Sequence, residues 1–281
     1  MPLSKLEFKA GVDKERSSYA SEGGWYETDK VRFRKGLPEK IGGWERISSN
    51  TFLGVARSLH TFADLNGVTH TGIGTHLKFY VEKGGIYYDI TPLRATVSLS
   101  NKFITTNGSN VLRVVDVNGG YVNNDFVTLT SATAFNGLLQ ANLEREYQIA
   151  YDPSVQATAL VDGASVDETP VLKSNTGTIQ IGMTVTGSGI SGVVYVKEVT
   201  NQNNIELSTT ATLSDETPLT FAFSHSYTIN VVDGSGSATN ANATTTTVGQ
   251  GSSATLAYQT STGVDVPTAF SGWGAGFWGE S

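Results

Sequence analysis

The chain has 281 residues, a formal net charge of −7 and a charged fraction of 16%. A hydrophobic fraction of 38% argues against disorder, and the absence of cysteine excludes disulfides, thiolate metal sites and a cysteine nucleophile. No apolar run reaches the roughly 18 residues of a membrane-spanning helix, and the first residues lack the apolar core of a secretion signal. We therefore expect neither a membrane span nor export by that route.

Residue usage predicts the fold class. The chain holds 31 glycines and 35 threonines but only 2 methionines. Threonine favours strands and glycine favours turns, whereas good helix formers are scarce, so we expect an all-β protein with many short strands.

Charge divides the chain into two parts. Residues 1–94 hold 14 basic and 11 acidic side chains, whereas residues 95–281 hold 5 and 15. Affinity for nucleic acid comes largely from cations that neutralise phosphates, so the acidic part would repel a polyanion. This distribution disfavours a uniformly basic nucleic-acid binder and suits a protein that DNA passes without adhering.

A basic strand is the first predicted element, after a polar arm at residues 1–22. Lys30, Arg32 and Arg34 alternate with Val31 and Phe33, which is the period of a half-buried strand. The turn residues that follow predict a turn over residues 35–44. Two interpretations stay open for the basic side chains: they form the solvated face of an ordinary strand, or they dock an acidic neighbour.

Tryptophan is confined to the two ends of the chain. Trp25 and Trp44 flank the basic strand, and Trp273 and Trp278 lie near the C-terminus. Trp25 and Trp44 are candidates for contact with a neighbouring subunit, although large aromatic side chains more commonly stabilise a core.

A run of antiparallel strands is predicted for residues 55–94. Apolar stretches there are separated by Asn66-Gly67 and by Gly84-Gly85, and both dipeptides are typical of hairpin turns. Three or four strands within about 40 residues match one blade of a propeller. A single blade cannot close a propeller without others.

Two small β modules are predicted for the middle of the chain. Alternating stretches such as 111–117, 125–131 and 146–152 indicate a first module over residues 96–152, with one short helix at 138–146. Further alternation between 169 and 224 indicates a second module over 153–224. Strands at 226–233 and 253–263 would then return the chain, over 225–281, to the framework of residues 1–95. The low-complexity segment 234–252 between them is predicted to be a flexible loop or a hairpin tip without a packed core.

No pattern in the sequence indicates catalysis. The histidines do not form a ligand set with suitable carboxylates, the acidic residues show no paired spacing, and no nucleotide-binding glycine motif opens a helix. We therefore expect no catalytic residue, no cofactor and no metal.

Three stretches resemble a known family. They are residues 8–44 (FKAGVDKERSSYASEGGWYETDKVRFRKGLPEKIGGW), residues 56–94 (ARSLHTFADLNGVTHTGIGTHLKFYVEKGGIYYDITPLR) and residues 257–279, which begin AYQTSTGVDV and end GWGAGFWG. Together they resemble the N-terminal part of the tail nozzle protein of short-tailed bacteriophages, also called tail tubular protein B.

The resemblance implies a structural role without an active site. Family members form a ring, usually a hexamer, that attaches to a tail adaptor protein, helps to anchor tail fibres and encloses the channel through which DNA leaves. The chain would then belong to the virion tail after synthesis in the cytoplasm of the bacterial host. Part of the acidic excess after residue 95 would face the channel, since like charge lets DNA slide.

The fold expected from residues and resemblance together is a propeller-like antiparallel framework with small inserted β-barrel or β-sandwich modules. The two chain ends, which hold all four tryptophans, would pack together on that framework. Two other functions stay open: a receptor- or glycan-binding tail module, and a tail-associated polysaccharide depolymerase.

Overall fold

The fold is all-β, as the composition predicts. A computed structural model describes residues 9–15, 17, 19–20, 23–43, 48–249 and 252–259. Strands make up 49% of the chain and helix 2%. The chain divides into two compact units, residues 1–51 and 52–281, and each is described by itself.

A β-hairpin is the regular structure of the first unit. It pairs β1 (Val31–Arg34) with β2 (Leu37–Lys40) in antiparallel register. Lys35 and Gly36 form the connection, with φ of 51° and 83°. Positive φ at both positions is the geometry of the two-residue hairpin turn that matches strand twist. The predicted turn over 35–44 is thus wrong for residues 37–40, which form the second strand.

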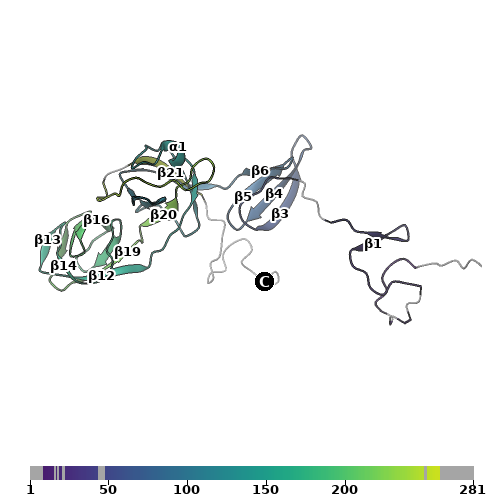
Figure 1. Ribbon diagram of the computed structural model, residues 1–281, viewed down its shortest axis with the longest axis horizontal. Helices are drawn as coiled ribbons and strands as arrows, with labels where there is room; N and C mark the ends of the chain where they lie inside the picture. Colours follow the sequence, from purple (N-terminus) through teal and green to yellow (C-terminus); the bar gives the residue numbers. More distant parts are fainter. Residues whose placement is uncertain are drawn as a thin grey trace, which may run out of the picture. The chain divides into compact units, whose positions relative to one another are not determined.

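The second unit begins with a four-stranded antiparallel sheet whose strands follow chain order (Figure 1). Its turns include Gly84-Gly85, where both residues have positive φ, and residues 64–67, where the Gly67 N–H donates to the Asp64 carbonyl at 3.0 Å. Both hairpins predicted for residues 55–94 are confirmed. The strands are β3 (Ala56–Ala63), β4 (Thr69–Thr75), β5 (Phe79–Lys83) and β6 (Ile86–Asp89).

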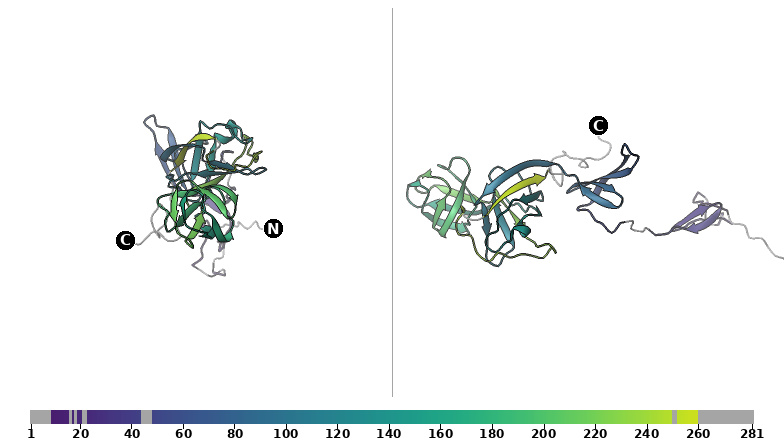
Figure 2. Two further views of the ribbon diagram at one scale, coloured as in Figure 1. Left: turned by 90° about the vertical axis from the view of Figure 1, so that its left-hand side faces the viewer. Right: turned by 90° about the horizontal axis from the view of Figure 1, so that it is seen from above.

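Two further sheets surround a shared core. One has four strands in the order β11-β10-β21-β7, and the other has three in the order β20-β9-β8. The long pair of β7 and β21 is clear in Figure 2. The elements are β7 (Leu93–Ser100), β8 (Phe103–Thr105), β9 (Val111–Val115), β10 (Phe126–Thr130), the short helix α1 (Gln140–Leu143), β11 (Glu146–Gln148), β20 (Ser226–Asn230) and β21 (Ser253–Gln259).

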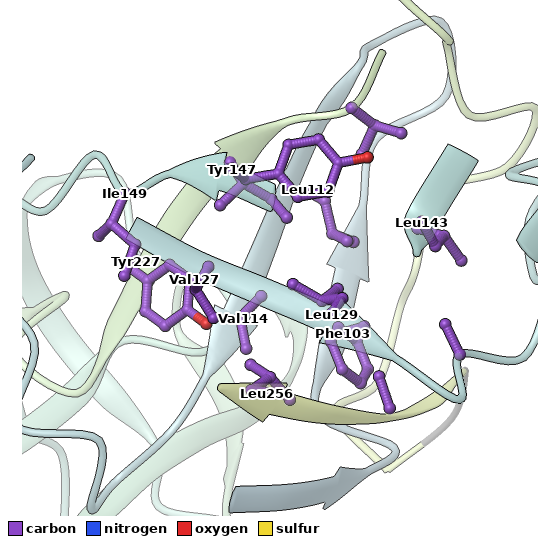
Figure 3. Close-up of a cluster of buried hydrophobic side chains, with 14 of the residues drawn as sticks. Phe103, Leu112, Val114, Val127, Leu129, Leu143, Tyr147, Ile149, Tyr227 and Leu256 are labelled. Atoms are coloured by element: carbon purple, nitrogen blue, oxygen red, sulfur yellow. The ribbon is translucent and has the colours of Figure 1, made fainter. Parts of the chain in front are cut away.

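Alternate residues of these strands fill the first core (Figure 3). Successive side chains of a strand point to opposite faces, so every second residue can be buried. Leu112 and Val114 of β9, Val127 of β10 and Tyr227 of β20 are fully buried in this way. Strands from residues 93–148 and from 226–259 therefore share one core.

A second core lies within residues 157–223. It is enclosed by a six-stranded sheet in the order β14-β12-β19-β15-β16-β17 and by the pair β13-β18. The strands are β12 (Val155–Val161), β13 (Ser165–Asp167), β14 (Leu172–Gly177), β15 (Thr184–Gly187), β16 (Val194–Asn201), β17 (Asn204–Leu207), β18 (Ala211–Leu213) and β19 (Pro218–Ala222).

The low-complexity segment is irregular but packed. Within residues 234–249, Ala241, Thr245 and Val248 are buried, which differs from the predicted absence of a packed core. The segment spans both cores because its backbone N–H groups donate to carbonyls on either side: Ala241 to Ser109 (2.9 Å), Thr245 to Thr105 (2.9 Å) and Val248 to Lys197 (2.8 Å).

A buried carboxylate lies in the first core. The Tyr258 hydroxyl donates to Asp116 Oδ2 at 2.6 Å, and the Tyr227 and Tyr258 hydroxyl oxygens lie 3.0 Å apart. The Asn118 N–H donates to the other carboxylate oxygen at 3.0 Å. Burial and the neighbouring Asp116 raise the pKa of Tyr258, so its hydroxyl stays protonated and remains a donor.

Removal of the Tyr258 hydroxyl tests this contact. A Tyr258→Phe variant leaves Asp116 Oδ2 without its phenol donor inside a core, which costs about 1–3 kcal/mol. We expect urea unfolding to show that loss in the free energy of unfolding. Tyr88→Phe is the matched control, because Tyr88 is 51% exposed. Equal stability of the two variants would contradict the assignment.

Candidate functional site

Arg32 and Arg34 lie on one face of the β1-β2 hairpin. Val31 and Phe33 are half-buried on the other face, whereas both arginines are exposed. Antiparallel partners share a face, so Glu39 lies beside Arg32 and Leu37 beside Arg34. Arg32 Nε is 3.1 Å from Glu39 Oε2, and both side chains are about half exposed. This pair is screened by water and contributes little to stability.

Arg34 and Lys30 have no ion-pair partner among the described residues, and the same is true of Lys35 and Lys40. Within the described residues no carboxylate oxygen lies within 4.0 Å of either side chain. Lys30 precedes β1 with a φ of 54°, and its carbonyl accepts from the Ile41 N–H at 2.7 Å. The predicted alternation thus holds for both arginines, while Lys30 closes the base of the hairpin.

Trp25 packs on the apolar side of the hairpin. Its ring centroid is 6.2 Å from that of Phe33 at an interplanar angle of 60°. The Asp13 N–H donates to the Trp25 carbonyl at 2.9 Å, which connects the preceding arm to this position. Trp44, Trp273 and Trp278 lie outside the described residues. The predicted packing of the two chain ends therefore stays a prediction.

The β3–β6 sheet has one covered face. Phe52 lies against it, with ring centroids 5.8 Å from Tyr80 and 5.0 Å from Tyr87. On the opposite face Phe62 stacks between two imidazoles, 6.3 Å from His60 and 5.5 Å from His70.

Both edges of this sheet are open among the described residues. β3 pairs only with β4, β6 pairs only with β5, and every residue of β3 is exposed. Leu59 and Ile86 are 67% and 49% exposed. An open edge presents unpaired backbone N–H and C=O groups, and exposed apolar side chains beside it are typical of a surface that another chain covers.

Three histidines make contacts that stabilise the fold. His76 Nδ1 accepts from the Val55 N–H at 2.9 Å, His70 Nε2 lies 3.2 Å from Asp64, and His225 Nδ1 lies 3.2 Å from the Thr184 hydroxyl. In the described part of the chain no three histidine or carboxylate side chains are grouped to hold a metal.

No protein-family model, curated protein or solved structure matches the chain. Among the described residues no helix is long and apolar enough to cross a membrane.

Lys78 anchors the β3–β6 sheet to the first core. Its ammonium nitrogen is 2.5 Å from Asp89 of β6 and 2.5 Å from Glu146 of β11. It also lies 4.6 Å from the centroid of the Phe126 ring, and the Lys78 side chain is only 2% exposed. Sequence alone did not single out this lysine, since nothing local distinguishes it from a surface lysine.

The ion pairs set the charge state of Lys78 and Asp89. Burial acts to lower the pKa of Lys78, but the hydrogen bonds that it donates to Asp89 and Glu146 outweigh burial and raise that pKa. Burial acts to raise the pKa of Asp89, but the bonds from Lys78 and Thr91 outweigh it and lower that pKa. The Asp89 contribution to stability is therefore present above its ordinary value of 3.8 and is lost as pH falls through its lower folded pKa.

Lys78→Met tests this anchor. The change leaves two adjacent carboxylates without their buried cation, and we expect about 3 kcal/mol lower stability at pH 7. The difference from the unmodified protein should shrink as the pH falls below about 4, because Asp89 then becomes protonated. Lys83→Met is the control, since Lys83 is exposed at the end of β5. A pH-independent difference in chemical denaturation would contradict this account.

Proposed function

We propose that the chain is a structural subunit of the tail nozzle ring of a short-tailed bacteriophage. It lines the DNA-ejection channel and connects the tail adaptor to the distal tail or fibres. The proposal rests on the resemblance carried by residues 8–44, 56–94 and 257–279. In this proposal the ring, a hexamer, belongs to the virion tail and is made in the host cytoplasm.

The open β3–β6 sheet is the observation that carries the proposal. Four antiparallel strands within residues 56–89 have the size of a propeller blade, and their two edges lack partners among the described residues. Assembly into a ring would cover such edges and the exposed apolar side chains beside them. In this proposal residues 153–224 are a module inserted into the first core, to which residues 96–152 contribute β8 to β11 and residues 225–281 contribute β20 and β21.

Surface charge after residue 95 supports passage of DNA. Residues 95–281 hold 15 acidic and 5 basic side chains. Near Lys173, the carboxylates of Asp162, Asp215 and Glu216 outnumber the single ammonium, and each is more than half exposed. An acidic wall repels phosphates, so DNA would move past without specific binding.

Assembly of the purified full chain tests the proposal. We expect a ring with an open centre by negative-stain electron microscopy. Native mass spectrometry should give the mass of six subunits of 29.8 kDa each. A monomer or trimer that binds host glycans would favour the receptor-binding alternative. Release of sugar from host polysaccharide would favour the depolymerase alternative. Either outcome without a ring contradicts the nozzle role.

The basic hairpin is the proposed contact with an acidic neighbour. Arg34→Glu reverses a charge that has no carboxylate partner among the described residues. We expect at least about tenfold weaker binding to the ring neighbour or the adaptor, with a reduced dependence on salt. Lys40→Glu is the matched control, because Lys40 shares the opposite face with Val31. Equal effects of the two variants in a sedimentation assay would show that the arginine face is not the contact.

A further inference from the structure

A cavity of about 360 Å³ lies where the two cores meet. Its wall comes from Ile104 and Arg113 on β8 and β9, from Gln180 and Ile181 before β15, and from the threonine-rich stretch 244–246. Gly182 allows the cores to approach closely here, since a Cβ at that position would lie 2.7 Å from Ile104 Cδ1. The cavity thus lies beside a close contact between the cores.

Arg113 belongs to the cavity wall, and strand alternation turns its side chain away from the first core. Its neighbours Leu112 and Val114 are fully buried in the first core, so the Arg113 side chain extends from the other face of β9. The guanidinium carbon lies 3.4 Å from the centroid of the Phe223 ring. Stacking on an aromatic face holds the guanidinium in position with its N–H groups still available.

The charge of Arg113 has no counterion in the described part of the chain. No carboxylate lies within 4.0 Å of it, and none of its guanidinium N–H groups donates a hydrogen bond there. By contrast, Lys173 has three carboxylate partners and Lys197 has one. Burial lowers the pKa of Arg113 to about 10, so the group stays charged at neutral pH. A partly desolvated cation without a partner is stabilised by an anion that joins it.

The remaining wall suits a ligand with both hydroxyl groups and C–H surface. The side chains of Gln180, Thr106 and Thr246 make no hydrogen bond to other described residues, which leaves donors and acceptors for a ligand. The apolar part of the wall consists of Ile104, Val111, Ile181 and Val199. Small-molecule sites typically combine such apolar walls with a few convergent polar groups.

The charge count favours a monoanion. Arg113 is the single cationic residue in the wall, and the cavity is larger than an inorganic anion needs. A guanidinium binds a carboxylate through two parallel hydrogen bonds, whereas phosphate sites usually gather several cations or backbone N–H groups.

We propose that this cavity binds an acidic sugar, with the carboxylate of a hexuronic acid residue on Arg113 and its hydroxyl groups on Gln180 and the cavity threonines. This site does not depend on the nozzle role, since it uses only contacts within residues 104–246. The polysaccharide surfaces of bacteria are one source of such sugars, and the free monosaccharide shares the same chemistry.

Ligand binding by the full chain tests the site. Saturation-transfer NMR and titration calorimetry with sodium glucuronate should show millimolar binding, with no binding of glucose under the same conditions. Arg113→Met keeps an apolar side chain on Phe223 but removes the charge, and we expect at least about tenfold weaker binding of glucuronate. Arg145→Met is the matched control, because the Arg145 Nε donates only to the Ala141 carbonyl and lies outside the cavity.

A second variant covers the case in which Arg113→Met impairs folding. Gln180 is exposed at the cavity mouth, so Gln180→Ala should leave the thermal midpoint unchanged while weakening glucuronate binding severalfold. An oligomer of glucuronate that binds more tightly than the monosaccharide would identify a polysaccharide as the source. Absence of glucuronate binding, binding unaffected by both variants, or equal affinity for inorganic phosphate would each overturn the proposal.

Discussion

The Asp116 carboxylate is the polar centre on which the first core depends. Asp116 is only 2% exposed, and its carboxylate accepts hydrogen bonds from the Tyr258 hydroxyl and the Asn118 N–H. Tyr258 belongs to β21, the strand between β10 and β7, and Tyr227 extends the contact to the other sheet. Because a buried carboxylate tolerates few arrangements of donors, it fixes how the late strand β21 enters a core built mainly from earlier residues.

Local signals predicted much of the fold, and the misses have physical causes. Gly-Gly and alternating apolar residues were sufficient for the β5-β6 hairpin, β10 and β20. β12 was not predicted, because its inward positions include Ala157 and Ala159, whose small side chains give a weak strand pattern. β2 was predicted as a turn because of Pro38. Proline is nevertheless compatible with a strand that has a partner on one side only.

The candidate sites, too, were predicted only in part. Alternation alone placed Arg32 and Arg34 on the exposed face of a strand. Arg113 was not predicted as a site residue, although it lies in the alternating stretch 111–117. The stacking on Phe223 and the absence of a nearby carboxylate depend on residues more than a hundred positions away, so no local pattern could have predicted the cavity. The role of Lys78 could not be predicted from a local pattern either, since its partner Glu146 lies far along the chain.

Segment 234–249 shows how a low-complexity sequence can hold a fixed conformation. Its contacts with both cores are made partly by backbone N–H groups, which every residue except proline supplies, and partly by the hydroxyl groups of Thr244, Thr245 and Thr247. Only Ala241, Thr245 and Val248 are restricted by their size, because these side chains are buried. Evolution can therefore exchange small polar residues and alanine at the exposed positions whose side chains make no hydrogen bond, such as Ala238 and Thr246, so that sequence divergence there need not signal a change of structure.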